Sequence, residues 1–74
     1  MEQEVPKQYV IYDHPQDHPN HFVVREWLIF PPGPQPGDAW LAETLEEART
    51  VLPPDVIQIG GTDPTVPHVI EVWM

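Results

Sequence analysis

Proline constrains the fold of this sequence more than any other residue type. Eleven of the 74 residues are proline, and ten of them fall in groups between the apolar segments. Because proline has no backbone N–H and fits poorly into helix interiors and central strands, each group marks an element boundary. The groups lie at Pro15 and Pro19, at Pro31 to Pro36, at Pro53 and Pro54, and at Pro64 and Pro67.

The chain is long enough for one domain, residues 1–74, with a small core. A chain of 8.5 kDa buries roughly 60% of the surface that its unfolded form exposes. The sequence has no cysteine, so neither disulfides nor thiolate metal sites can strengthen that core. Hydrophobic residues make up 41% of the chain, which predicts a folded protein in spite of the prolines.

Two segments before the longest proline group have the pattern of strands. Residues 8–12 are aromatic and β-branched. Residues 21–30 alternate with a period of two and carry apolar side chains on both faces, which predicts a central strand. Residues 31–37 contain four prolines, which cannot donate ladder hydrogen bonds, and are predicted to form a stiff, partly polyproline-like loop.

One short helix is predicted after this loop. Thr44 and Glu47 match a capping box, which places the helix start at Thr44. Leu45, Ala48 and Leu52 follow at helical spacing, and Pro53 ends the pattern after about two turns. Residues 39–43 are predicted to form a short strand before the cap; the alternative is a longer helix capped by Asp38.

The last part of the sequence predicts a hairpin. Residues 56–59 and 66–74 have strand composition, and the glycine-containing segment 60–64 between them favours a turn. Glu71 shares one strand face with apolar neighbours, and we expect Arg25 to be its ion-pair partner. The predicted fold is therefore α+β, an antiparallel sheet of four or five strands with one short helix on one face, in the order β-β-(β)-α-β-β.

The charge of the chain excludes some functions. Twelve acidic residues stand against three basic ones, for a net charge of -9, and such a surface repels phosphate backbones. We expect no direct contact with nucleic acid. The sequence begins without the basic and apolar regions of a secretory signal and has no long apolar run, so we expect a cytoplasmic protein without membrane contact.

Three of the four histidines lie in the repeated Asp-His-Pro segment, residues 13–21. His14 and His18 have the spacing of a helical zinc pair, but proline follows each of them and disfavours helical backbone there. A loop metal site remains an alternative, with His14, Asp17, His18 and His21 as ligands for zinc or nickel. The simpler interpretation is a polar turn between two strands.

No catalytic arrangement stands out in the sequence. Cysteine and serine are both absent, and Gly60-Gly61 lacks the lysine and hydroxyl residue of a phosphate loop. Glu46 and Glu47 are a pair of carboxylates, but on an exposed helix they have no environment that would make them acid and base catalysts. We therefore predict a protein that is not an enzyme and needs no cofactor.

The acidic side of the predicted helix is the best candidate for binding. Closely spaced carboxylates imitate phosphates and can pair with arginine and lysine in a basic groove of a partner protein. The alternative is a solvated face, on which the helix dipole favours acids near the N-terminus. The predicted partner-binding residues are Asp38, Glu43, Glu46 and Glu47.

Four segments of the chain carry a resemblance to other proteins: Asp13 to Pro15, Phe22 to Trp27, Leu41 to Arg49 and Val69 to Trp73. They resemble segments of small uncharacterised phage and prophage proteins of bacteria. The resemblance spans most of the chain and implies an origin in a mobile element, without a catalytic motif to transfer. The size, acidity and predicted fold are also similar to those of many anti-CRISPR proteins, an analogy of class.

These observations lead to one main hypothesis and two alternatives. The main hypothesis is a phage-type accessory protein in the host cytoplasm that binds and blocks a basic protein surface, as an anti-defence inhibitor or nucleic-acid mimic. The first alternative is a metal-binding module built on the histidine loop. The second is a structural protein that dimerises, because the last strand is expected to leave a free edge for pairing.

Overall fold

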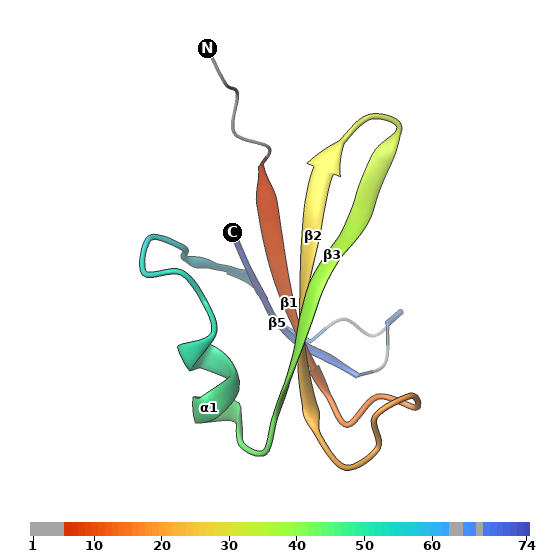
Figure 1. The fold of residues 1–74 in the computed structure, drawn as a ribbon, viewed down its shortest axis with the longest axis vertical. Helices are drawn as coiled ribbons and strands as arrows, with labels where there is room; N and C mark the ends of the chain where they lie inside the picture. Colours follow the sequence, from red (N-terminus) through yellow and green to blue (C-terminus); the bar gives the residue numbers. More distant parts are fainter. Residues whose placement is uncertain (1–5, 63–64, 67) are drawn as a thin grey trace.

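The described residues of the protein form a five-stranded antiparallel sheet and one short helix. The computed structural model describes residues 6–62, 65–66 and 68–74. The sheet order is β3-β2-β1-β5-β4, and each neighbouring pair is antiparallel (Figure 1). This confirms the predicted fold class. The elements are β1 (Lys7–Asp13), β2 (Phe22–Phe30), β3 (Gly33–Ala42), α1 (Leu45–Thr50), β4 (Gln58–Gly60) and β5 (Val69–Trp73).

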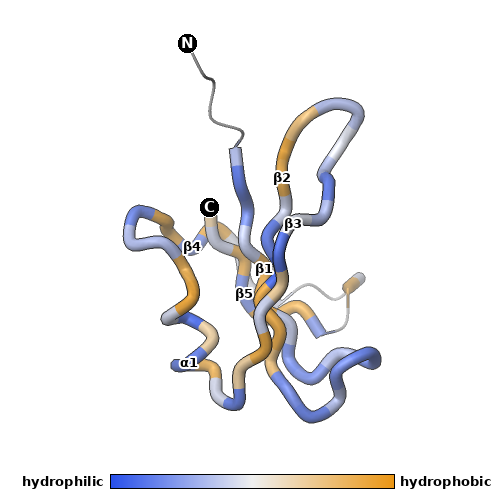
Figure 2. Tube along the Cα trace, viewed as in Figure 1, coloured by the Kyte–Doolittle hydropathy of each residue, from blue (hydrophilic) through white to orange (hydrophobic). Residues whose placement is uncertain are grey.

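The first strand in the sequence is the middle strand of the sheet. On β1, Ile11 lies opposite Val24 of β2 and Glu71 of β5, so these three side chains share one face. Ile11 and Val24 are both 0% exposed. Helix α1 covers this face through Ala48, which is also buried, and the core forms between helix and sheet. Figure 2 shows hydrophobic residues over much of β2 and hydrophilic residues in the loop between β1 and β2.

The helix begins where the sequence predicts. The backbone N–H of Glu47 donates to the Thr44 hydroxyl at 3.0 Å, which is the expected cap. Helix α1 is one turn and a half long, because tighter bonds from Val51 to Ala48 and from Leu52 to Arg49 end it. The alternative start is wrong, since Asp38 lies within β3.

The predicted loop at residues 31–37 is wrong beyond its first two residues. Strand β3 begins at Gly33, and Pro34 and Pro36 lie opposite Ile29 and Trp27 of β2. An edge strand tolerates proline because one of its sides has no neighbouring strand to receive an N–H bond. The short strand predicted at residues 39–43 is therefore the second half of β3, which ends at Ala42.

The predicted C-terminal hairpin is confirmed, but its place in the sheet is not the expected one. Strand β5 pairs with β1 on one side and with β4 on the other, so it is not an edge. The dimer hypothesis that relied on a free edge of the last strand loses its basis. Part of the predicted turn at 60–64 lies outside the described residues.

No helix in the described part of the chain is long and apolar enough to cross a membrane.

The threonine cap leads to a first prediction. Replacing Thr44 with alanine is expected to lower the free energy of unfolding by about 1 kcal/mol, because the Glu47 N–H loses its acceptor. Urea unfolding followed by circular dichroism measures the loss. Thr44→Ser keeps the hydroxyl and is the control; equal losses in the two variants would contradict the cap assignment.

Candidate functional site

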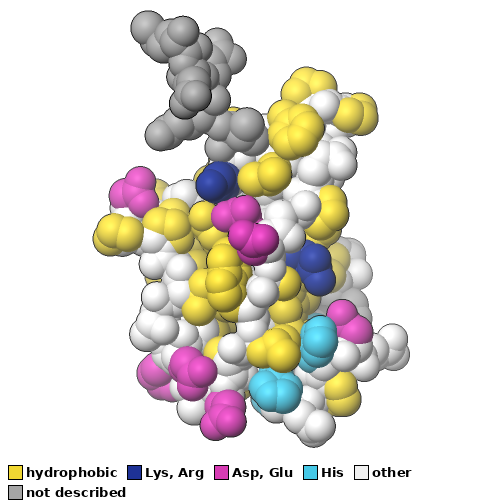
Figure 3. All heavy atoms as spheres, viewed as in Figure 1, with side chains coloured by type: hydrophobic (Ala, Val, Ile, Leu, Met, Phe, Trp, Pro, Cys, Tyr) yellow, Lys and Arg dark blue, Asp and Glu magenta, His cyan; other side chains and the backbone are white. Residues whose placement is uncertain are grey.

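Three of the four predicted partner-binding residues lie together. Glu43 stands between β3 and α1, and Glu46 and Glu47 lie in the first turn of α1; all three are exposed. We call Glu43, Glu46 and Glu47 the acidic patch. Figure 3 shows acidic side chains gathered at lower left, over α1 and the turn before it. Asp38 is exposed but stands apart, because about 13 Å of extended strand separates its Cα from that of Ala42.

Among the described residues, the charge of Arg49 acts on Glu46 of the acidic patch without forming an ion pair with it. Within the described residues, no ion pair within 4.0 Å involves Glu43, Glu46 or Glu47. The base of α1, Arg49, is bound to Glu71 instead. The pKa of Arg49 is raised, first by its hydrogen bond to Glu71 and less by the charges of Glu71 and Glu46. The patch therefore presents negative charge to the solvent.

An ion pair attaches the helix to the sheet. Arg49 Nε donates to Glu71 Oε1 at 3.1 Å, and Arg49 Nη2 donates to Glu71 Oε2, so the contact has two bonds. The Trp73 ring N–H donates to Glu71 Oε1 at 2.9 Å. Glu71 is only 6% exposed, and its pKa is lowered mainly by the Arg49 hydrogen bond, against the opposing effect of burial. This pair holds the acidic patch in a definite orientation.

The predicted partner of Glu71 was wrong. Arg25 lies opposite Val10 on β1, whereas Glu71 lies opposite the next residue, Ile11. Consecutive strand residues point to opposite faces, so Arg25 and Glu71 are on different sides of the sheet. The helix supplies the arginine that the strand cannot.

The histidine segment forms a compact turn at one end of the sheet. His14 has a positive φ of 49°, contacts the Asp13 carboxylate, and packs its ring edge-on against Phe22 at 4.8 Å between centroids. The backbone N–H of His18 donates to Pro15, and that of His21 to His18, which are the bonds of successive turns.

The candidate metal ligands do not converge. The His18 ring lies 3.9 Å from the Asp17 carboxylate. Within the described residues, no group of three or more His, Asp or Glu side chains is close enough to hold a metal ion. His14, Asp17, His18 and His21, all described, are thus not assembled into a site.

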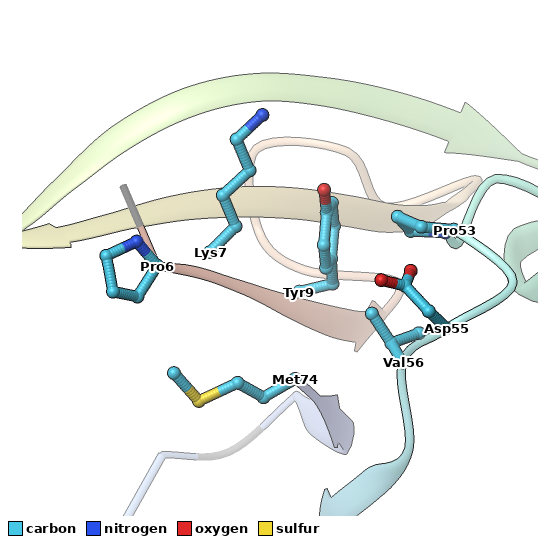
Figure 4. A pocket seen from close by; sticks show the side chains of 7 residues that line it. All are labelled: Pro6, Lys7, Tyr9, Pro53, Asp55, Val56 and Met74. Carbon is cyan, nitrogen blue, oxygen red and sulfur yellow. The ribbon is translucent and has the colours of Figure 1, made fainter. Parts of the chain in front are cut away.

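A pocket that the sequence did not predict lies beyond the helix, against β1. It has a volume of about 290 Å³ and is shown from close by in Figure 4. Its residues are brought together only by the fold, since they come from β1, from the connection after α1 and from the end of the chain, and no local motif indicates it. The lining residues are Pro6, Lys7, Tyr9, Pro53, Asp55, Val56 and Met74.

Comparisons with known protein families, with curated proteins and with solved structures found no match for this chain.

Proposed function

We propose that this chain is a phage-type accessory protein, without catalytic activity, that binds and blocks a basic surface on a partner protein. The observation that carries the proposal is the acidic patch: Glu43, Glu46 and Glu47 are exposed and have no ion-pair partner among the described residues. Their charge is therefore available to a partner.

The way in which α1 is fixed to the rest of the protein supports recognition of a partner's surface by the acidic patch. The cap at Thr44 and the pair between Arg49 and Glu71 hold α1 at both of its ends. Because the backbone of α1 is already ordered, pairing of these carboxylates with arginine or lysine costs side-chain entropy but no backbone ordering. The net charge of -9 adds long-range attraction to a basic surface.

The proposal predicts a salt-sensitive interaction that depends on the patch. Replacing Glu46 and Glu47 with glutamine is expected to weaken binding to the basic partner about tenfold at low salt, because each exposed pair contributes up to about 1 kcal/mol. At high salt the unchanged protein and the double variant should bind the partner with similar, weak affinity, since screening removes the electrostatic contribution of Glu46 and Glu47. A pull-down from host lysate identifies the partner, and calorimetry at two salt concentrations measures the affinities.

A matched control changes the same net charge outside the acidic patch, on β1 and the turn after it, two strands away from the end of β3. Asp13 and Asp17 are exposed residues of the β1 end and the histidine turn, and replacing both with asparagine also removes two negative charges. Binding of this variant should stay close to that of the unchanged protein. If both double variants lost affinity equally, net charge rather than the patch would explain binding, and the assignment of the site would be wrong.

A further inference from the structure

We propose that the pocket against β1 is a binding site for an arginine side chain of a partner protein. This inference goes beyond the proposed function, because none of the pocket residues belongs to the acidic patch. It rests on three properties of the pocket: the arrangement of its polar groups, its local charge and its apolar walls.

The polar groups of the pocket reach it from two segments. Lys7 and Tyr9 are two positions apart on β1, and Figure 4 shows their side chains extending to the same side of the strand. In the same view, Asp55 approaches from the connection after α1 with its carboxylate directed toward Tyr9. A ligand in the pocket therefore meets the exposed carboxylate of Asp55, whereas Tyr9 is only 6% exposed.

The local charge favours a cation over an anion. The positive charge of Lys7 is offset by Glu26, whose Oε2 lies 3.9 Å from Lys7 Nζ and also accepts the Tyr9 hydroxyl at 3.1 Å. Among the described residues, no ion pair within 4.0 Å involves Asp55, so its negative charge is not neutralised by a neighbouring base. An anionic ligand would have to displace Glu26 from Lys7.

Tyr9 remains a neutral phenol at physiological pH. Its pKa is raised, first by burial, then by the hydrogen bond to Glu26 and by the charges of Glu26 and Asp55. Tyr9 is only 6% exposed and its hydroxyl is bound to Glu26, so Asp55 is the group in this pocket that a guanidinium group can bond directly.

The size and walls of the pocket fit one side chain. At about 290 Å³ the pocket is at the lower limit of ligand sites, which begin near ~300 Å³. Pro6, Pro53, Val56 and Met74 form apolar walls for the aliphatic part of an arginine. Arginine fits better than lysine because its planar head can form two parallel hydrogen bonds with the Asp55 carboxylate.

The test uses N-acetyl-arginine amide as the probe and N-acetyl-citrulline amide, which has the same shape without the charge, as its control. In two-dimensional NMR of the full chain, the arginine probe is expected to shift the amide signals of Lys7, Tyr9, Asp55, Val56 and Met74, and the citrulline probe is expected to leave them in place. Asp55→Asn should weaken the binding of the arginine probe about fivefold, as expected for an exposed ion pair.

Asp38→Asn, which changes the same charge on exposed β3, should leave the affinity for the probe unchanged. Equal shifts with citrulline, shifts confined to α1, or equal losses in the Asp55 and Asp38 variants would each overturn the proposal. The outcome is independent of the patch experiment, because Glu46 and Glu47 remain in every protein used here.

Discussion

Replacing Ile11 with alanine is expected to lower the free energy of unfolding by about 3 kcal/mol, within the usual range for truncating a buried isoleucine. Ile11 is 0% exposed and lies on the middle strand, where it contacts the helix side of the core. A domain of 74 residues has a total stability of roughly 4 to 11 kcal/mol. The variant should therefore lose a large share of that stability, measured by urea unfolding with tryptophan fluorescence.

The control removes the same atoms from an exposed site. Ile57 is 68% exposed beside β4, so Ile57→Ala should change the free energy of unfolding by no more than about 0.5 kcal/mol. If the Ile11 variant were as stable as the Ile57 variant, the centre of the core would not lie at β1.

Replacing Arg49 with methionine is expected to destabilise the protein at pH 7 and to change its response to acid. The variant leaves the charge of Glu71, which is 6% exposed, without its arginine partner. In the unchanged protein the pKa of Glu71 is below its ordinary value of 4.5, chiefly because of the Arg49 hydrogen bond. Its contribution to stability is therefore present above about pH 4.5 and is lost as pH falls through the lowered value.

In the methionine variant, the charge of Glu71 is expected to lower the stability of the folded protein instead of raising it. Burial then acts on Glu71 without the arginine and favours the protonated acid, opposed by the Trp73 hydrogen bond. The difference in stability between the two proteins should therefore narrow as pH falls from 7 to 3. Urea midpoints measured across this range give the difference at each pH, and a difference that stayed constant would contradict the role of the Glu71 charge.

Two further variants separate the ion pair from general effects of charge. Arg25→Met removes the same charge on the opposite face of the sheet and should affect stability less than Arg49→Met. The double variant of Arg49→Met with Glu71→Gln leaves no buried charge at position 71 and should be more stable at pH 7 than Arg49→Met alone. The reverse order in either comparison would show that Arg49 acts in another way.

Local interactions made parts of the structure predictable. The capping box at Thr44 and Glu47 depends on residues three positions apart, and the alternation in residues 22–30 depends on neighbours within one strand. The patch was predictable in the same way for Glu43, Glu46 and Glu47. The position of Asp38 was not predictable, because its separation from the acidic patch depends on β3 remaining extended up to Ala42.

The proline-rich edge strand shows where local reasoning fails. Pro34 and Pro36 argue against a strand when the sequence is considered alone, since a central strand needs their missing N–H groups. At the edge of a sheet that need disappears on one side of the strand. Which strand lies at an edge depends on strand order, and residues next to each other in the sequence do not encode it.

The sequence by itself determined the fold class, the strand at residues 22–30, the cap of the helix at Thr44, and the large negative charge. Only the tertiary structure decided that β1 lies in the middle of the sheet, that Arg49 rather than Arg25 binds Glu71, and that the described histidine and acidic side chains of the turn lie apart from one another. The pocket between Tyr9 and Asp55 belongs to the same group. The physical reason is that caps and strand periodicity depend on near neighbours, whereas ion pairs, ligand sets and pockets depend on which distant segments the fold places together.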